Sequence, residues 1–235
     1  MAYKVVSVSP TFGYYVRTPI DFLKERGCDV ELFSQDKKEG LSKYLKDVDA
    51  IIVGLEKFSR DIIASAPRLK IIAKHGAGVD NIDITAASER GIAVVTAKGA
   101  NSDAVADLVI GLILSLARNI PYADKSIRGK KWERIIGIQV NNKVLGIIGL
   151  GNIGKKVASR AKGFDMQILA YDAIRDNEFA RRVGIKYVNR DTVLSKADFV
   201  TIHLPLNGET RGMIAKPELG MMKPTAYLIN TARGG

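Results

Sequence analysis

The stretch from Val144 to Gly154, Val-Leu-Gly-Ile-Ile-Gly-Leu-Gly-Asn-Ile-Gly, decides the fold of this chain. An apolar strand leads into three glycines spaced as GxGxxG, and a helix is expected to begin among them. In that setting Gly149 permits a tight turn, Gly151 lets a pyrophosphate approach the backbone, and Gly154 lets the helix pack on the strand. The N–H groups and the positive dipole at the start of the helix then face the phosphates of a dinucleotide. A purely structural turn between strand and helix is the alternative.

An acidic residue after the next strand distinguishes a dinucleotide site from a purely structural turn. Asp172 lies 18 residues beyond Gly154 (172 − 154 = 18), near the spacing of about 20 that is typical of a ribose-binding acid. Its carboxylate would accept hydrogen bonds from the ribose diol and repel a 2′-phosphate, which favours NAD(H) over NADP(H). Arg175 is close enough in the sequence to leave this preference open.

Short apolar runs alternate with amphipathic segments along almost the whole chain, which predicts parallel sheets with helices on both faces. In the first half, strands are expected at 3–9, 30–33, 50–53, 70–74 and 92–96, and helices at 19–26, 60–66 and 82–90. In the second half, strands are expected at 144–148, 166–171, 185–188, 199–203 and 226–230, and helices at 152–163, 176–182 and 191–196. The predicted fold class is therefore α/β, with two doubly wound parallel-sheet domains.

The character of the sequence changes near Lys98–Gly99, so domains are expected at residues 1–99 and 100–235. A long helix from about 103 to 119 is apolar nearly all round, and it must be buried within its domain or against a second subunit. Residues 122–142 are then expected to form an arm with short helical pieces.

Composition excludes several classes of protein. The 235 residues include 36 Lys and Arg against 25 Asp and Glu, hence a net charge of +11, and one cysteine, Cys28. The lone cysteine excludes an internal disulfide framework and no secretion signal follows Met1, so a cytoplasmic location is expected. The most apolar run, Leu108–Ala117, is far short of the ~20 residues that a membrane span needs. The basic residues are scattered without a nucleic-acid motif, so neither nucleic acid nor membrane is a predicted partner, and no metal site is predicted.

Three further segments point to a family. They are Gly76–Asp83 (Gly-Ala-Gly-Val-Asp-Asn-Ile-Asp), His203–Gly212 (His-Leu-Pro-Leu-Asn-Gly-Glu-Thr-Arg-Gly) and Asn230–Gly235 (Asn-Thr-Ala-Arg-Gly-Gly). With the glycine motif between the first two, their order and spacing resemble the D-isomer-specific 2-hydroxyacid dehydrogenases. Arg128–Arg134 (Arg-Gly-Lys-Lys-Trp-Glu-Arg) resembles the phosphoglycerate dehydrogenase branch of that family. The resemblance covers about residues 41–235.

This resemblance implies a flavodoxin-like substrate domain followed by a Rossmann-type NAD-binding domain. The implied reaction moves a hydride between NAD(H) and C2 of a D-2-hydroxy acid or its 2-oxo form, with 3-phosphoglycerate or a related small acid as substrate. Backbone N–H groups of Gly76, Ala77 and Gly78 would hold the substrate carboxylate, since such a turn after a strand forms an anion-binding concavity. The other implied substrate-binding residues are Lys74, His75 and Asn101. For His75 a purely structural place in the loop is an equal alternative.

Arg233 is the residue expected to carry catalysis, because its guanidinium can hold a 2-oxo acid bidentately and polarise its carbonyl. Histidine titrates near neutral pH, but the motif places His203 beside the cofactor, so it is not expected to donate the proton. The resemblance implies a cofactor site formed by Val105, Gly149, Gly151, Asn152, Ile153, Gly154, Asp172, His203, Pro205, Thr210, Thr231 and Ala232.

The chain departs from the family pattern at Gly235, where it ends. Similar enzymes continue beyond this motif and there supply the Glu–His pair that donates the proton. The dinucleotide domain is therefore expected to be incomplete and the 235-residue chain alone inactive, since proton transfer contributes ~10²–10⁴-fold. Smaller departures are Asp107, where glutamate is usual, and Asn207–Gly208, where Thr-Pro is common.

Neither the identity of the substrate nor the class of function is fixed by the sequence. Lys74, His75 and the net charge favour a phosphorylated or otherwise doubly anionic acid. For the dehydrogenase, a homodimer through residues 101–140 is expected. An NADH-sensing protein on the same scaffold, like the C-terminal-binding co-repressors, is the alternative from another class, although no peptide-docking signature is present. A basic nucleic-acid protein would instead bind DNA with a steep salt dependence.

Overall fold

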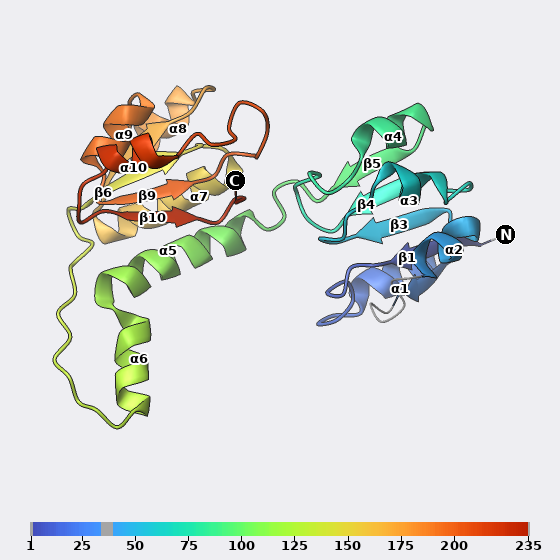
Figure 1. Ribbon diagram of the computed structural model, residues 1–235, viewed down its shortest axis with the longest axis horizontal. Helices are drawn as coiled ribbons and strands as arrows, with labels where there is room; N and C mark the ends of the chain where they lie inside the picture. Colours follow the sequence, from blue (N-terminus) through green and yellow to red (C-terminus); the bar gives the residue numbers. More distant parts are fainter. Residues whose placement is uncertain (1, 34–39, 235) are drawn as a thin grey trace. The chain divides into compact units, whose positions relative to one another are not determined.

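The structure is a computed structural model that describes residues 2–33 and 40–234. It divides into two compact units, Met1–Asn101 and Ser102–Gly235. In each unit the described residues form a five-stranded sheet whose neighbouring strands are all parallel, with helices between the strands (Figure 1). The predicted fold class, α/β with two doubly wound parallel sheets, is confirmed.

The sheet of the first unit has the order β2-β1-β3-β4-β5, which is the flavodoxin-like order. Its strands are β1 (Tyr3–Ser7), β2 (Cys28–Leu32), β3 (Ala50–Val53), β4 (Ile71–Lys74) and β5 (Ala93–Thr96). Its helices are α1 (Thr18–Glu25), α2 (Leu41–Tyr44), the 3-10 helix η2 (Leu45–Asp47), α3 (Arg60–Ala64) and α4 (Ile84–Glu89). The chain moves from β1 outward to β2 and then crosses back to β3. The carboxyl ends of β1 and β3 therefore form the topological switch point, where open α/β sheets bind ligands.

The core of the first unit fixes the loops that follow β3 and β4. Val6 and Ile51, in neighbouring strands, are fully buried, and so is Phe58 beyond β3. Phe58 donates its N–H to the carbonyl of Asn81 at 2.7 Å and accepts from the N–H of Asp83 at 3.0 Å. These bonds hold the segment after β3 against the segment after β4.

The sheet of the second unit has the order β10-β9-β6-β7-β8. Strands β6, β7 and β8 have the order of one half of a Rossmann fold, and β9 and β10 add two strands beside β6. Its strands are β6 (Val144–Ile148), β7 (Gln167–Tyr171), β8 (Ile185–Tyr187), β9 (Phe199–Ile202) and β10 (Tyr227–Asn230). Its helices are α5 (Ser102–Arg118), α6 (Ile120–Arg128), α7 (Asn152–Ala161), the 3-10 helix η3 (Lys162–Phe164), α8 (Asn177–Val183), α9 (Arg190–Lys196) and α10 (Lys216–Met221). The switch point lies between the carboxyl ends of β6 and β9.

Two apolar layers cover the two faces of this second sheet. Helices α5 and α7 lie on one face, around Val109, Ile113 and Val157. Helix α9 lies on the other face, around Val193 and Leu194, with α10 beside it (Figure 1). The layers hold the strands rigidly, so the loops at their carboxyl ends have a fixed base.

Helix α5 buries one stripe rather than its whole circumference within this chain. Val109 and Ile113 are buried, whereas Leu108 and Leu112 are 54% and 36% exposed. At the start of the helix, Asp107 binds Arg160 of α7 through an ion pair of 2.6 Å. The aspartate that replaces the usual glutamate therefore joins the two helices.

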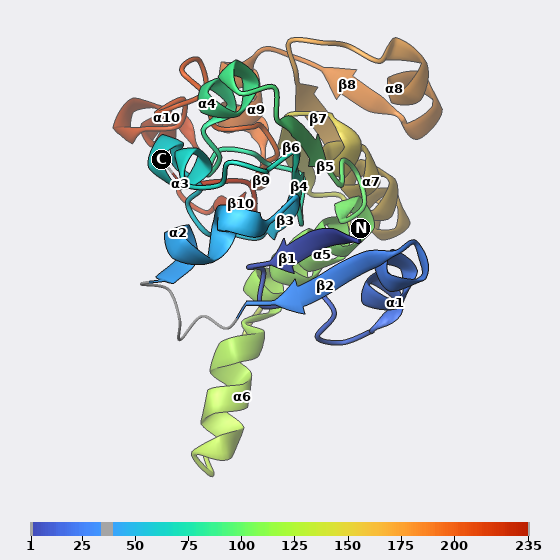
Figure 2. The ribbon, with the colours of Figure 1, turned by 90° about the vertical axis from the view of Figure 1, so that its right-hand side faces the viewer.

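Helix α6 begins at a break in the backbone, since Asn119 has a left-handed φ of 53° and Pro121 stands in the first turn that follows. Figures 1 and 2 show that α6 extends away from the sheet of its unit. Residues 129–142 contain no helix or strand, so the arm has one helix of nine residues where several short pieces were expected. No single helix among the described residues is long and apolar enough to cross a membrane. Helices α5 and α6 meet the criteria of length and composition together, as a pair with a bend of 64° between them.

Candidate functional site

The glycine-rich turn of the second unit lies between β6 and α7, at the switch point of the sheet. Gly149 has a φ of 96°, and a Cβ there would lie 2.9 Å from the backbone of His203. Gly154 faces the carbonyl of Gly149 so closely that a Cβ has no room. Gly151 instead has open space where a Cβ would point, and it precedes α7 without capping that helix through a side chain. Open space and unpaired helix donors therefore coincide at this turn.

The carboxylate of Asp172 reaches the same turn. One oxygen accepts from the N–H of Leu150 at 2.6 Å, and the other accepts from the N–H of Ile174 at 2.9 Å. Because a carboxylate has about four acceptor sites, capacity remains for a diol. In the sequence, Arg175 left the choice between NAD(H) and NADP(H) open. In the structure its guanidinium lies 5.5 Å from the ring centre of Tyr187.

His203 follows β9, across the switch point from the glycines. Its Nε2 lies 3.0 Å from the hydroxyl of Thr201, and its buried Nδ1 has no hydrogen-bond partner within the described part of the chain. Burial lowers the pKa of His203 from 6.5 to about 4. The imidazole is therefore neutral at pH 7 and has no proton to donate from a cationic form.

The lowered pKa of His203 predicts how stability depends on pH. The unfolded chain binds a proton below pH 6.5 but the folded chain only near pH 4, so the free energy of unfolding falls as the pH drops through this window. The difference between the two pKa values corresponds to about 3 kcal/mol at the acidic end. We expect His203→Gln to remove this part of the pH dependence in urea unfolding between pH 7.5 and 4.5. Identical slopes for variant and wild type would contradict the assignment, because all other titrating groups are common to both.

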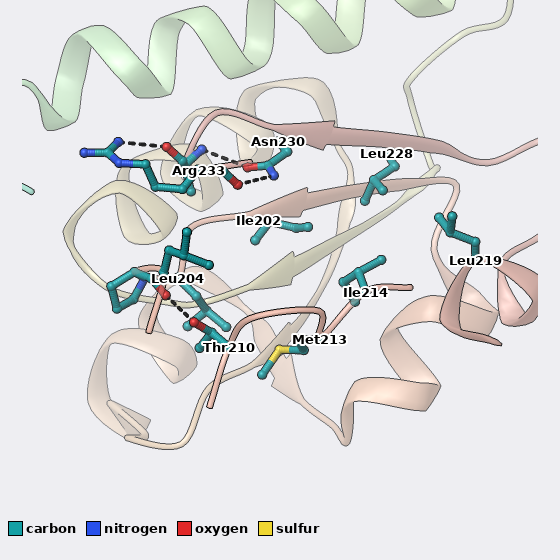
Figure 3. Close-up of a pocket in the computed structure, with 12 residues that line it drawn as sticks. Ile202, Leu204, Thr210, Met213, Ile214, Leu219, Leu228, Asn230 and Arg233 are labelled. Carbon is teal, nitrogen blue, oxygen red and sulfur yellow. Dashed lines mark hydrogen bonds between the residues drawn. The ribbon is translucent and has the colours of Figure 1, made fainter. Parts of the chain in front are cut away.

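A pocket of about 180 Å³ lies between the ends of β9 and β10 and the loop that follows β9. Four of the predicted residues line it together, namely Pro205, Thr210, Ala232 and Arg233. Figure 3 shows Thr210 and Arg233 at one end of the pocket and Leu228 at the other. The structure therefore brings predicted cofactor positions and the predicted catalytic residue of this unit to one place.

The hydroxyl of Thr210 organises the loop after β9. It donates to the carbonyl of Pro205 at 2.5 Å and accepts from the N–H of Asn207 at 2.9 Å. The side-chain oxygen of Asn207 accepts in turn from the N–H groups of Glu209 and Thr210, both at 3.0 Å. The asparagine that replaces the usual threonine thus closes an Asx turn. A contact between Thr210 and a pyrophosphate stays a prediction.

Arg233 lies on an exposed turn after β10 that Asn230 holds in shape. The Asn230 amide donates to the carbonyl of Arg233 at 2.7 Å, and its oxygen accepts from the N–H of Ala232 at 2.9 Å. The Arg233 guanidinium donates to the carbonyl of Ala232 at 2.9 Å. Thr231 lies between Asn230 and Ala232, and its buried hydroxyl has no hydrogen-bond partner among the described residues. A buried hydroxyl without a partner calls for an explanation, and a ligand bound at this turn would supply one.

The remaining predicted positions lie at helix starts and at the end of the first unit. Asn152 and Ile153 form the first turn of α7, and Ile153 packs on the core. Val105 is half-buried in the first turns of α5. Asn101 is exposed and is the last residue of the first unit.

Lys74 ends β4 with its side chain inside the first unit, and the residue is only 6% exposed. Its ammonium group donates to the carbonyl of Gly54 and, at 2.7 Å, to the side chain of Asn81. The Asn81 amide also donates to the carbonyl of Glu56 at 2.6 Å. These contacts join the ends of β3 and β4 and hold the ammonium group inside the unit, while contact between Lys74 and a substrate stays a prediction.

The loop after Lys74 presents backbone donors. Gly76 has a φ of 143°, which side chains disfavour, and its N–H already donates to the carbonyl of Lys74 at 2.9 Å. The N–H groups of Ala77 and Gly78 have no backbone partner among the described residues. Ala77 and Gly78 are therefore the donors that can hold a carboxylate. His75 is exposed, with Nδ1 2.9 Å from the hydroxyl of Ser9.

Beside this loop a hollow of about 370 Å³ lies at the switch point of the first sheet. It is lined by residues that follow β1, β3 and β4, namely Ser9, Pro10, Thr11, Gly54, Leu55, Glu56 and His75. Sequence reasoning found only His75 among them. The signal that could have found Ser9 and Thr11 is their place just beyond the first strand of a doubly wound sheet.

Comparison with known proteins gives concordant matches. Residues 110–235 match the family described as D-isomer specific 2-hydroxyacid dehydrogenase, NAD binding domain. The D-3-phosphoglycerate dehydrogenase of Archaeoglobus fulgidus is 42% identical over 219 residues, which are 92% of this chain and 42% of that protein. The glyoxylate reductase of Thermococcus litoralis is 40% identical over 223 residues, which are 89% of this chain and 67% of that protein.

A solved structure shows the same architecture. The D-lactate dehydrogenase from Aquifex aeolicus, complexed with NAD and lactic acid, superposes with a TM-score of 0.86 at 27% identity. The match covers 98% of this chain and 69% of that chain. Against the phosphoglycerate dehydrogenase, by contrast, this chain spans less than half of the relative's length.

Proposed function

Because this chain belongs to the D-isomer specific 2-hydroxyacid dehydrogenases, we propose that its protein interconverts a small D-2-hydroxy acid and the matching 2-oxo acid. The family resemblance drawn from the sequence motifs is thereby confirmed. When bound, NADH supplies the hydride that C2 of the oxo acid accepts, while a proton goes to the carbonyl oxygen. The relatives bear the names of different acids, so this proposal is limited to the class of D-2-hydroxy acids.

We also propose a cytoplasmic location, where a free thiol such as that of Cys28 stays reduced.

One observation carries the proposal, namely the open space at Gly151 beside the uncapped start of α7. A pyrophosphate fits that space because the helix presents unpaired N–H donors and a positive dipole end to it. The orphaned hydroxyl of Thr231 and the spare acceptor capacity of Asp172 offer further hydrogen bonds to a dinucleotide. The residues present therefore fit NAD.

The residues of this chain have distinct tasks in the proposed reaction. Ala77 and Gly78 offer N–H donors to the substrate carboxylate, as the loop geometry supports. Arg233 polarises the carbonyl that accepts the hydride, which stabilises negative charge on its oxygen. His203 lies beside the cofactor as a neutral group, so we assign it no proton transfer.

Binding of NADH to the 235-residue chain, measured by fluorescence titration, tests the role of Asp172. We expect Asp172→Asn to weaken NADH binding about tenfold, because the charge that binds the ribose diol is lost. The amide oxygen still accepts from Leu150, while the NH2 group replaces the oxygen that accepted from the exposed N–H of Ile174. Binding of NADPH should weaken less, since the repulsion of its 2′-phosphate disappears.

Asp176→Asn is the matched control for this prediction. Asp176 lies four residues beyond Asp172, caps α8 and binds Lys155, so its loss changes local charge without removing either backbone hydrogen bond of Asp172. An unchanged dissociation constant for NADH in Asp172→Asn, or an equal loss in the control, would refute the ribose role. A protein at its natural length that binds no NADH would refute the proposed function itself.

We further propose a homodimer formed through residues 101–140. Large apolar side chains are exposed there, including Trp132 at 91%, Ile136 at 84% and Ile127 at 57%, and such clusters are typical of protein interfaces. Sedimentation should give twice the chain mass of 25.6 kDa for the wild type and the single mass for Ile136→Asp. Ile174→Asp is the control, because Ile174 is 85% exposed but lies outside the arm; a monomeric wild type would contradict the dimer.

A further inference from the structure

The loop that follows β7 carries the two residue types that distinguish one dinucleotide from the other. An acid binds the ribose diol of NAD(H), whereas an arginine nearby accommodates the 2′-phosphate of NADP(H). Here the acid is Asp172, and one of its carboxylate oxygens accepts from the N–H of Ile174. Arg175 follows Ile174 directly and is exposed. An arginine therefore adjoins the turn that Asp172 closes.

The guanidinium of Arg175 has a partner in the neighbouring strand. It lies 5.5 Å from the ring centre of Tyr187, the last residue of β8, which is within the range of a cation–π contact. Strand β8 is the outer strand of the sheet and lies beside β7 (Figure 2). The register pairs Tyr187 with Ala170, two residues before Asp172. The sheet itself therefore places the ring of Tyr187 next to the loop.

The hydroxyl of Tyr187 holds the same loop. It accepts from the N–H of Asp176, the residue after Arg175, at 3.0 Å. The carboxylate of Asp176 in turn accepts from the N–H of Phe179 at 3.0 Å and binds Lys155 of α7 at 2.5 Å. The backbone beyond Arg175 is therefore anchored. Tyr187 acts on this one arginine twice, because its hydroxyl fixes the adjoining backbone and its ring binds the side chain.

We propose that the ring of Tyr187 competes with a 2′-phosphate for the guanidinium of Arg175 and thereby strengthens the preference for NAD(H). The inference rests on the proposed function and gives Tyr187 a positioning role, since it acts through Arg175. A 2′-phosphate can use the arginine only in those molecules where the guanidinium has left the ring, so the apparent affinity for NADPH falls by that fraction. For an exposed cation–π contact the reduction is about three- to fivefold. NADH has a hydroxyl group in place of this phosphate and is not affected.

The test measures the dissociation constants of NADH and NADPH by fluorescence titration of the protein at its natural length. Tyr187→Leu removes the ring and should strengthen NADPH binding about three- to fivefold. Binding of NADH should be nearly unchanged, because the backbone bonds of Asp172 go to Leu150 and Ile174. Tyr187→Phe keeps the ring and should keep the wild-type ratio of the two constants. A merely structural role of Tyr187 would weaken the binding of both dinucleotides alike.

A double-mutant cycle addresses Arg175 itself. Arg175→Ala should weaken NADPH binding more in the Tyr187→Leu background than in the wild type, because no ring then withholds the guanidinium. The two losses should differ by about three- to fivefold. Tyr187 is half-buried, so Tyr187→Met, whose longer side chain fills more of the same space, replaces Tyr187→Leu if that variant does not fold.

Arg182→Ala is the matched control for the cycle. Arg182 is also exposed, and its guanidinium lies 5.4 Å from the centre of a different ring, that of Phe179 in the same helix. Its replacement removes the same charge and the same kind of contact without involving Tyr187. It should therefore change NADPH binding by the same factor in both backgrounds.

The outcomes separate this inference from the proposed function. An unchanged ratio of the two dissociation constants without the ring, with NADH still bound, would overturn the role of Tyr187 and leave the proposed function in place. Equal losses on Arg175→Ala in both backgrounds would also overturn it. A protein that binds neither NADH nor NADPH would overturn both proposals.

Discussion

Replacement of Arg233 by lysine should lower kcat/KM for the preferred 2-oxo acid by about a hundredfold to a thousandfold. Lysine keeps the charge but lacks the planar fork that makes two parallel hydrogen bonds to an acid. Losing a donor aimed at the oxygen where negative charge develops has effects of ~10²–10³ on rate. The turn itself is held by Asn230, so the backbone should keep its shape. Steady-state NADH oxidation by the protein at its natural length measures the loss.

Arg211→Lys is the control for this experiment. Arg211 is another exposed arginine of the same unit, in the loop after β9 and outside the residues that line the pocket near Arg233. Its replacement should leave kcat/KM unchanged. Binding of NADH should be nearly unchanged in both variants, because the guanidinium acts on the substrate carbonyl. Activity of Arg233→Lys within a few-fold of the wild type would remove Arg233 from the catalytic role.

Much of the fold could be predicted from hydrophobic periodicity alone. The strands β3 and β6 were expected at 50–53 and 144–148, and the structure has them at those residues. Both are continuous apolar runs that a parallel sheet buries on two faces, so little competes with the strand. The helices α2 and α10 were not expected, because α2 has only four residues and α10 contains Pro217 and Gly220, which are typical of turns.

The glycine motif could be placed from sequence, but the separate reason for each glycine needed coordinates. Gly149 and Gly154 are confined by neighbouring backbone, whereas Gly151 is not. Sequence spacing treats the three alike. The distinction matters because only open space can receive a ligand.

The direction of the Lys74 side chain could not be predicted from its position at a strand end. Its two partners, Gly54 and Asn81, lie 20 and 7 residues away in the sequence, and the packing of two loops brings them together. Ser9 and His75 are 66 residues apart and meet at the switch point of the sheet. Such pairings depend on strand order, which the local pattern of one sequence does not determine.

Alanine at Gly154 should reduce the free energy of unfolding of the chain by about 1–3 kcal/mol, the usual cost of overpacking. A Cβ there collides with the carbonyl of Gly149, and both groups are fixed between β6 and α7. The loss runs against helix propensity, which favours alanine over glycine by ~1 kcal/mol inside a helix. Urea unfolding of the 235-residue chain measures it. A Gly154→Ala variant as stable as the wild type would mean that helix and strand separate at little cost.

Alanine at Gly151 should do the opposite, leaving stability nearly unchanged while weakening NADH binding more than about tenfold. Its Cβ meets nothing within 4 Å, so the folded chain accommodates it, but it enters the space through which a pyrophosphate would approach the α7 donors. Gly163→Ala is the control, since that Cβ also meets nothing within 4 Å and lies beyond the other end of α7. If Gly151→Ala binds NADH like the wild type, the open space is not the phosphate site, because a methyl group there cannot coexist with a phosphate in contact with the backbone.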